Sequence, residues 1–430
     1  MSVEQGRLDD GPGLPRGLAL ATWGLFVGLA MLMLSGGLFS TLLGVRGEQR
    51  GLPTVVSSMV SAAYYVGFLA GSVLTMRGLG RVGHIRVYAA LASLLAAAII
   101  GIGITDDAVS WIFLRLVTGL CFAGLYVVAE SWLNDLADND NRGRLLAVYG
   151  ALTIAFYGLG QVSVSLFDPL LVTGFAVAAI CTSLAVAPVA LSEKAVAPAA
   201  EDSQPMSLRE LSKIVPTGVV SCLLVGIAHG AMSGMAAVYA TRVGLGLVGL
   251  FVALPSIGGV ILQWPISSTS DEIDRRAVGV AASLSAAGAA ALMLLDSPHK
   301  PMAFFLFMLV GGFSYPLYSV VGAYTNDWIE PEHLTGAASQ LVKMYGLGAI
   351  AGPILAGAMM GLIGPTGFPW ALVGMHLVIA LFFFYRMLAW RAPLAKRPWS
   401  EVSLPARAFY VPATVIAIGR RRVRRRRTGE

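Results

Sequence analysis

Three charged side chains lie within long apolar runs of this 430-residue sequence, where a charge requires a partner or a function: Arg115, Glu130 and Lys343. A buried arginine can hold an anion or donate to backbone carbonyls, and a buried glutamate can carry a proton or form a structural ion pair. Lys343 has two interpretations: its flexible side chain reaches the nearest polar surface, or it belongs to a functional site.

Other polar and aromatic groups interrupt the same apolar runs, among them Tyr126, Tyr318, His229 and Gln161. His229 titrates near neutral pH in ordinary surroundings, so it is a second candidate proton carrier after Glu130. A tyrosine or histidine in such a run is also a common packing residue. Both interpretations are open for each of them.

The sequence offers little other chemistry. Its three cysteines (Cys121, Cys181 and Cys222) all lie in apolar stretches, as small buried side chains do. There is no CxxC or His/Cys cluster, no GxxxxGK[ST] nucleotide-binding loop, and no evident pairing of nucleophile and base. We therefore expect no metal, no cofactor and no enzymatic activity.

The elements that position these residues are long apolar helices. Hydrophobic residues make up 56% of the chain and charged residues only 13%, too few to cover a soluble protein of this size. About 20 apolar residues form a helix that crosses a bilayer. We predict twelve such spans: 18–43, 54–76, 87–104, 109–133, 145–166, 170–191, 214–240, 247–266, 278–295, 302–326, 335–363 and 370–388.

An eleven-residue segment occurs twice, at Leu125–Asp135 and Leu317–Asp327, with an offset of 192 residues and five identical positions. Gly160-Gln161 and Gly352-Pro353 keep the same offset. An internal repeat of this length in an apolar chain predicts two similar halves, which is typical of membrane transporters. The charges do not follow the repeat, since Arg115 aligns with Phe307 and Glu130 with Gly322.

Basic residues set the expected orientation. If the N-terminus is inside, the inner loops carry ten Lys and Arg residues and the outer loops four, which places both termini in the cytoplasm. A polar stretch before span seven ends in a segment, 207–213, that could form a short surface helix. The predicted organisation is a cytoplasmic segment 1–17, a six-helix bundle 18–191, a cytoplasmic linker 192–213, a second six-helix bundle 214–388 and a basic cytoplasmic tail 389–430.

The tail ends in a cluster of arginines beside a fairly apolar stretch. Such a cluster favours binding to anionic lipids at a membrane surface, and a topology anchor or a simple basic end is the alternative. We expect no nucleic-acid partner. The arginines are Arg420, Arg421, Arg422, Arg424, Arg425, Arg426 and Arg427.

The loop QWPISSTSDEIDRR, residues 263–276, is similar to the signature loop of the major facilitator superfamily, in which an aspartate and arginines latch neighbouring helices on the cytoplasmic side. Asp271, Arg275 and Arg276 match its positions, and Asp274 lies among them. The sequences of this loop, of the segment Tyr126–Asp135 and of FSYPLYS (313–319) resemble those of the YcaD-like branch of bacterial transporters.

The resemblance implies further roles. In the first half, Arg81 and Gly83 fit the signature loop, but Gly80 replaces its aspartate, so a strong ionic latch is not expected there. The repeat ends, Asp135 and Asp327, are assigned to the latches. The spacing of Arg115 and Gly119 is similar to an RxxxG motif of the fourth helix, often found in proton-coupled carriers. The superfamily's cavity-lining helices would place Met31, Tyr126, His229 and Tyr318 at the central site.

These features predict an all-α protein of the bacterial inner membrane, a secondary transporter that works by alternating access. The first expectation is proton-coupled export of a small amphipathic solute. The alternatives are uptake of an organic anion held by Arg115, and a non-transporting receptor or scaffold.

Overall fold

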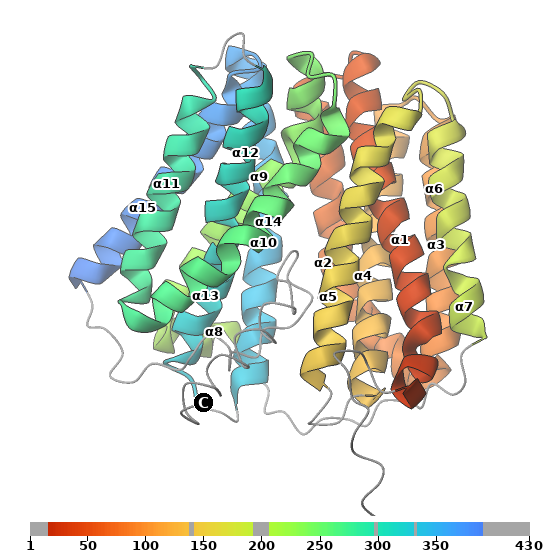
Figure 1. Ribbon diagram of the computed structural model, residues 1–430, viewed down its shortest axis with the longest axis horizontal. Coiled ribbons are helices and arrows are strands. Elements are labelled where there is room, and N and C mark those ends of the chain that lie inside the picture. Colours follow the sequence, from red (N-terminus) through yellow and green to blue (C-terminus); the bar gives the residue numbers. More distant parts are fainter. Residues whose placement is uncertain (1–15, 137–141, 192–205, 296–299, 331–332, 390–430) are drawn as a thin grey trace, which may run out of the picture.

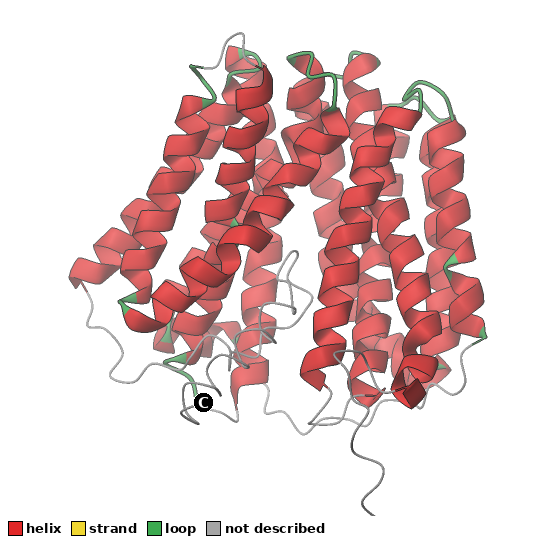
Figure 2. Ribbon diagram, in the orientation of Figure 1, coloured by secondary structure: helices red, strands yellow, loops and turns green. Residues whose placement is uncertain are grey.

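The computed structural model describes residues 16–136, 142–191, 206–295, 300–330 and 333–389, and all regular structure among them is helical (Figure 2). The helices form two groups that stand side by side, α1 to α7 and α9 to α15 (Figure 1). The predicted basic tail and most of the predicted linker and N-terminal segment lie outside the described residues.

The first group contains six spans. The sixth consists of two helices that join at Ala185. The helices are α1 (Arg16–Gln49), α2 (Thr54–Val82), α3 (His84–Ile104), α4 (Ala108–Leu136), α5 (Arg142–Val162), the short 3-10 helix η1 (Ser163–Leu166), α6 (Thr173–Leu184) and α7 (Val186–Ala190).

The second group follows a short polar helix, α8 (Leu208–Ile214). Ser207 caps α8 by accepting a hydrogen bond from the backbone N–H of Glu210, as expected for a surface helix at this position. The spans are α9 (Pro216–Arg242), α10 (Val248–Glu272), α11 (Arg275–Leu292), α12 (Lys300–Ser314), α13 (Pro316–Asn326), α14 (Leu334–Ile363) and α15 (Gly367–Ala389).

Two of these helices make a single span. The helix is interrupted between α12 and α13 at Tyr315, directly before Pro316, whose ring nitrogen cannot donate a helical hydrogen bond. Eleven spans in the described part of the chain are long and apolar enough to cross a membrane. The twelfth, α11, begins with Arg275 and Arg276 and packs against α12 and α15.

The predicted repeat is visible in the helix packing. Gly160 on α5 lies so close to α1 that a β-carbon would collide with the carbonyl oxygen of Leu34. Gly352 on α14 lies in the same way against the carbonyl oxygen of Ile227 on α9. Small residues let helix backbones approach within a membrane, so the paired glycines set the same α1–α5 and α9–α14 crossings in both halves.

The bundle has two ends, which we name from the chain. The linker end is where α1 begins, α7 ends, α8 lies and α15 ends. The far end is where α1 ends and α2 begins (Figure 1). The sequence predicts that the linker end is cytoplasmic, and this orientation and the predicted domain boundaries stay predictions.

Candidate functional site

Arg115 lies on α4 with its side chain buried between aromatic rings. Its guanidinium carbon is 4.5 Å from the ring centre of Tyr64 and 5.4 Å from that of Phe39, so both rings stabilise the cation through their π-faces. Its Nε and Nη1 have no hydrogen-bond partner, and no carboxylate pairs with it among the described residues. The side chain therefore has two free donors and an uncompensated charge.

A cavity of about 60 Å³ lies beside this guanidinium and between the two halves. Helices α1, α2, α4 and α5 of the first half and α9 and α10 of the second contribute to its wall. Besides Trp111, its polar lining consists of ten side chains: Ser40, Thr41, Ser57, Ser61, Tyr64, Tyr65, Arg115, Tyr157, Gln161 and Ser233.

The lining has one formal charge, that of Arg115, and contains no aspartate, glutamate, lysine or histidine from the described residues. Thr41 Oγ1, Ser57 Oγ and Gln161 Oε1 are buried and, like Arg115 Nε and Nη1, lack partners. Buried polar atoms are almost always paired in folded proteins. Five such atoms thus belong to residues that line one cavity, whose described lining carries a single positive charge.

The two halves are joined beside this cavity. Ser61 on α2 donates to the carbonyl oxygen of Gly234 on α9 at 2.9 Å, and the hydroxyls of Tyr65 and Ser233 are 2.8 Å apart. Gly249 on α10 lies against the carbonyl oxygen of Gln161 on α5. Along the helices, these contacts lie between the middle of the bundle and the far end.

A charged clamp joins the halves at the far end itself. Arg242 at the end of α9 donates to both carboxylate oxygens of Glu48 on α1, at 2.6 and 2.7 Å, and to Thr54 Oγ1 at 2.8 Å. Gly47 and Val238, neighbours of the clamp in sequence, line the cavity. The clamp therefore joins the two halves at the far end, next to the cavity.

Our sequence reasoning did not find this clamp or the cavity residues Thr41 and Ser57. The clamp carries one signal that could have revealed it: Glu48 and Arg242 are separated by 194 residues, close to the repeat offset, and lie at equivalent helix ends. The hydroxyl residues have no such signal, because serine and threonine also occur in apolar helices as packing residues.

The structure places the predicted pathway residues in different environments. Arg115 and Gln161 line the cavity, whereas Met31, Tyr126 and Glu130 lie outside its lining. Glu130 is buried toward the linker end of α4 and accepts a hydrogen bond from the Tyr149 hydroxyl at 3.3 Å. Tyr126 donates to Met33 Sδ at 3.0 Å, and Met31 is half-buried against the core of the first half.

The other three pathway candidates lie in the second half and outside the cavity lining. His229 Nε2 faces the carbonyl oxygen of Ser314 at 3.1 Å, so Nε2 carries the proton, and Nδ1 accepts from Tyr345 at 3.0 Å. Tyr318 is buried with its hydroxyl unpaired, and its ring contacts that of Tyr345. Lys343 is exposed, with Nζ 3.4 Å from Gln340 Oε1. The roles of these residues stay predictions.

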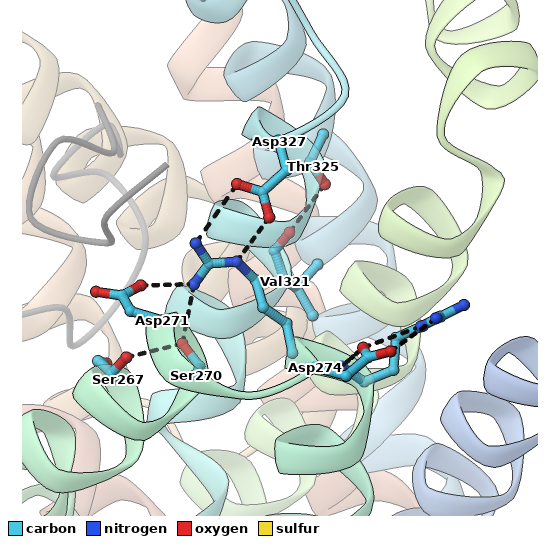
Figure 3. Close-up of polar contacts among 9 residues, drawn as sticks. Ser267, Ser270, Asp271, Asp274, Val321, Thr325 and Asp327 are labelled. Atoms are coloured by element: carbon cyan, nitrogen blue, oxygen red, sulfur yellow. Dashed lines mark hydrogen bonds and ion pairs between the residues drawn. The ribbon is translucent and has the colours of Figure 1, made fainter. Parts of the chain in front are cut away.

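The second-half latch forms a network at the linker end (Figure 3). Arg275 donates to Asp327 at 2.8 and 3.4 Å, to Asp271 at 2.8 Å and to Ser270 at 3.0 Å. The side chains of Arg275 and Asp327 are only 1% and 0% exposed. The loop before α11 is thereby tied to the end of α13, where the second copy of the repeat ends.

Arg276 connects the same loop to α15. Asp274 caps α11 by accepting from the backbone N–H of Arg276, and its carboxylate also pairs with the Arg276 guanidinium at 2.7 Å (Figure 3). Arg276 Nη1 donates to the carbonyl oxygen of Arg386 on α15 at 2.9 Å. The five predicted second-half latch residues thus lie together, and their gating role stays a prediction.

The first half lacks an equivalent network among its described side chains. Gly83, with a positive φ of 89°, is the N-cap residue that precedes α3. His84, the first residue of α3, places Nε2 3.1 Å from Ser131 Oγ on α4. In the first half, a histidine–serine contact thus lies close to the place that corresponds to the ion pair of the second half. The side chains of Arg81 and Asp135 lie outside the described residues.

The described helices thus form two groups of spans with a polar cavity between them, which is the architecture of a membrane transporter. The sequence profile of the Major Facilitator Superfamily matches residues 25–248 and 243–427. The chain belongs to this superfamily, which confirms the predicted twelve-helix fold; its family members are transporters and not enzymes.

Relatives in sequence are proteins named uncharacterized MFS-type transporter YcaD. That of Salmonella newport is 30% identical over 345 residues, which cover 78% of this chain and 88% of the relative. That of Escherichia fergusonii is 28% identical over 341 residues, with the same coverage. The predicted resemblance to this branch is confirmed.

Solved structures share the fold at low sequence identity. The D323A mutant of the nucleoside transporter NupG aligns with a TM-score of 0.74 and 12% identity, over 86% of this chain and all of that chain. A bacterial homologue of the human lysosomal transporter Spinster, in an inward-facing and occupied conformation, aligns with a TM-score of 0.71 and 11% identity, over 88% of this chain and 98% of that chain.

Proposed function

We propose that this transporter carries a small organic anion, with Arg115 as the group that binds its charge. The observation that carries the proposal is the buried guanidinium of Arg115, which belongs to the cavity wall, has two unpaired donors and has no carboxylate beside it in the lining. An uncompensated charge inside a membrane protein is costly. A bound anion would supply the missing charge and hydrogen-bond acceptors.

Export of an amphipathic solute, the first expectation from the sequence, finds less support. It assumed a mostly apolar, methionine-containing lining, whereas hydroxyl, amide and guanidinium groups surround this cavity and Met31 is absent from its wall. The apolar part of an amphipathic solute would offer no acceptor to Arg115, whose donors would stay unpaired at a cost in free energy.

We further propose that transport is uptake coupled to protons across the bacterial inner membrane, with the linker end in the cytoplasm. The membrane potential, negative inside, opposes entry of an anion by about 2.3 kcal/mol per charge at 100 mV. One accompanying proton removes this cost. Glu130 is the preferred carrier, because it is a buried carboxyl group on the same helix as Arg115.

The clamp of Arg242 and Glu48 supports alternating access for this site. It ties the halves at the far end, and the hydrogen bonds of Ser61 and Tyr65 join them beside the cavity. In the proposed cycle these contacts break when the halves rock to admit the anion from outside, and they form again when the site faces the cytoplasm.

Uptake into proteoliposomes tests the proposal. A panel of radiolabelled short carboxylates and their neutral amides is offered with and without an imposed pH gradient, acidic outside. We expect saturable, gradient-stimulated uptake of carboxylates only. Arg115→Gln should abolish it, and Arg115→Lys should raise KM, because lysine keeps the charge but loses the planar donor fork.

Arg50→Gln is the matched control, since Arg50 lies at the far end outside the cavity lining and should leave uptake intact. Glu130→Gln should retain carboxylate exchange but lose its response to the pH gradient. Carboxylate uptake that persists in Arg115→Gln, or equal wild-type uptake of carboxylates and their neutral amides, would count against the anion site.

A further inference from the structure

Lys343 is a cation within a membrane span, and no carboxylate pairs with it among the described residues. It lies nine residues after Leu334, the first residue of α14, which places it about 14 Å from the linker end of this helix at 1.5 Å per residue. Its side chain is exposed, and Nζ donates to Gln340 Oε1 at 3.4 Å. Because hydrocarbon solvates charge poorly, an ionisable group inside a span usually faces water or a functional partner.

The face of α14 that carries Lys343 meets the first half of the protein. A β-carbon on Gly346 would lie 3.3 Å from Leu69 Cδ1 on α2, and one on Gly361 would lie 3.8 Å from a methyl carbon of Val55 on the same helix. Lys343 precedes Gly346 by three residues and Gly361 by eighteen, and eighteen residues make about five full turns. Lys343 therefore lies on the side of α14 that packs against α2.

This interface of α2 and α14 leads from the cavity toward the linker end. On α2, Ser61 and Tyr65 line the cavity, and Leu69 follows Tyr65 by one turn in the direction of the linker end. On α14, Lys343 lies beyond Gly346 in the same direction. The exposed ammonium group is thus accessible between the cavity and the linker end, where the two halves meet.

Polar side chains accompany Lys343 along the exposed face of α14. Thr335 and Ser339 precede it at intervals of four residues, and both are exposed. Leu347, four residues after Lys343, is the first large apolar side chain of this stripe. A helix face that is polar from the linker end to Lys343 fits a water-filled passage better than contact with lipid chains.

We infer that Lys343 is a second binding position for the transported anion, on the passage between the cavity and the linker end. An anion that leaves Arg115 in this direction loses the one formal charge of the cavity lining. A second cation on the passage raises the local concentration of anions and speeds their binding from this side. The ligand is a small carboxylate, and a lipid phosphate is the competing source of the same chemistry. The inference rests on the proposed function and adds a charged residue of the second half to the pathway.

Protection of Lys343 from an amine-reactive reagent tests the contact in the unaltered protein. Full-length protein in dodecyl maltoside, without added lipid, reacts with N-hydroxysuccinimidyl acetate, and peptide mass spectrometry follows the acetylation of each lysine. Sodium propionate replaces sodium chloride at constant ionic strength. We expect propionate to slow acetylation of Lys343 about twofold or more once its concentration reaches Kd, and propionamide to have no effect. Lys213 on α8, exposed at the linker end, is the internal control and should react at an unchanged rate.

Transport kinetics test what the contact does. Propionate exchange is measured in proteoliposomes for entry from the linker end and, separately, for entry from the far end. Lys343→Gln should raise KM for linker-end entry about tenfold at low salt and leave KM for far-end entry unchanged, and Lys343→Arg should keep both wild-type values. The difference should shrink at high ionic strength, because salt screens an accessible charge. Lys213→Gln is the matched control and should behave as the wild type.

The outcomes separate this inference from the proposed function. Protection of Lys343 by added phosphatidylglycerol but not by propionate would make Lys343 a lipid contact and overturn the inference, as would equal changes of KM on both sides. Neither result affects the anion site at Arg115. That site fails separately, if the affinity of the wild type for propionate survives Arg115→Gln.

Discussion

The ion pair of Arg275 and Asp327 is buried in the second half. We expect that breaking it lowers the free energy of unfolding more than breaking any other described polar contact of this half. Both side chains are essentially unexposed, and two hydrogen bonds join them at 2.8 and 3.4 Å. Removing one partner of a buried pair leaves a charge in a medium that solvates it poorly, which costs about 3–5 kcal/mol of unfolding free energy. We expect that loss for Arg275→Gln.

The neighbouring contact supplies an internal standard. Asp271 also pairs with Arg275, but its side chain is 25% exposed, so water compensates for its loss. Asp271→Asn should cost about 1 kcal/mol or less. Asp327→Asn should fall between the two, because Arg275 then keeps Asp271 as a counter-charge.

The assay is reversible unfolding in mixed detergent micelles, followed by circular dichroism, with a double-mutant cycle of Arg275→Gln and Asp327→Asn. The double variant should be more stable than the summed single losses predict, by about 1–3 kcal/mol, because two neutral side chains replace the pair. Additive losses, or an Arg275→Gln loss below about 1 kcal/mol, would refute the reasoning.

Three further predictions concern the far end. Arg242→Gln weakens the clamp to Glu48 by about 1.5 kcal/mol, so the ratio of molecules open at the far end to molecules closed there should rise about tenfold. Spin-label distances between the halves measure this ratio, and an unchanged ratio would contradict the role of the clamp. Gly249→Val places a branched side chain against the α5 backbone, which should destabilise the closed state by about 1–3 kcal/mol and slow transport without reducing membrane insertion. The hydrogen bond from Arg46 lowers the pKa of Asp106 below its ordinary value. The ionised carboxylate therefore stabilises the folded protein above about pH 4, and this contribution disappears as pH falls through the lowered pKa. Asp106→Asn should be less stable than the wild type at pH 7 and equally stable in strong acid, as measured by unfolding in detergent micelles.

Much of the fold follows from the sequence because membrane helices are dictated by local composition. The start of α4 was predicted at residue 109 and is observed at Ala108, and that of α14 was predicted at 335 and is observed at Leu334. The break at Pro316 was not predicted, because prolines within membrane helices are often tolerated: Pro255 and Pro265 both lie inside α10.

The site was predictable only where a residue type was unusual for its surroundings. Arg115 is conspicuous in an apolar run, and the structure places it at the cavity. His229 was equally conspicuous, yet it hydrogen-bonds Ser314 and Tyr345 within the second half. Sequence alone shows how deep a residue lies in the membrane but not which face of the helix meets the other half.

The most direct test of the account compares a charged ligand with its neutral isostere at Arg115. The affinities of propionate and propionamide are measured by calorimetry for the wild type and for Arg115→Gln. The account predicts that the wild type prefers propionate by about tenfold or more, as for hydrogen bonds to charged groups, and that this preference disappears in the variant. A preference for propionate that survives Arg115→Gln would contradict the claim that Arg115 binds the anion.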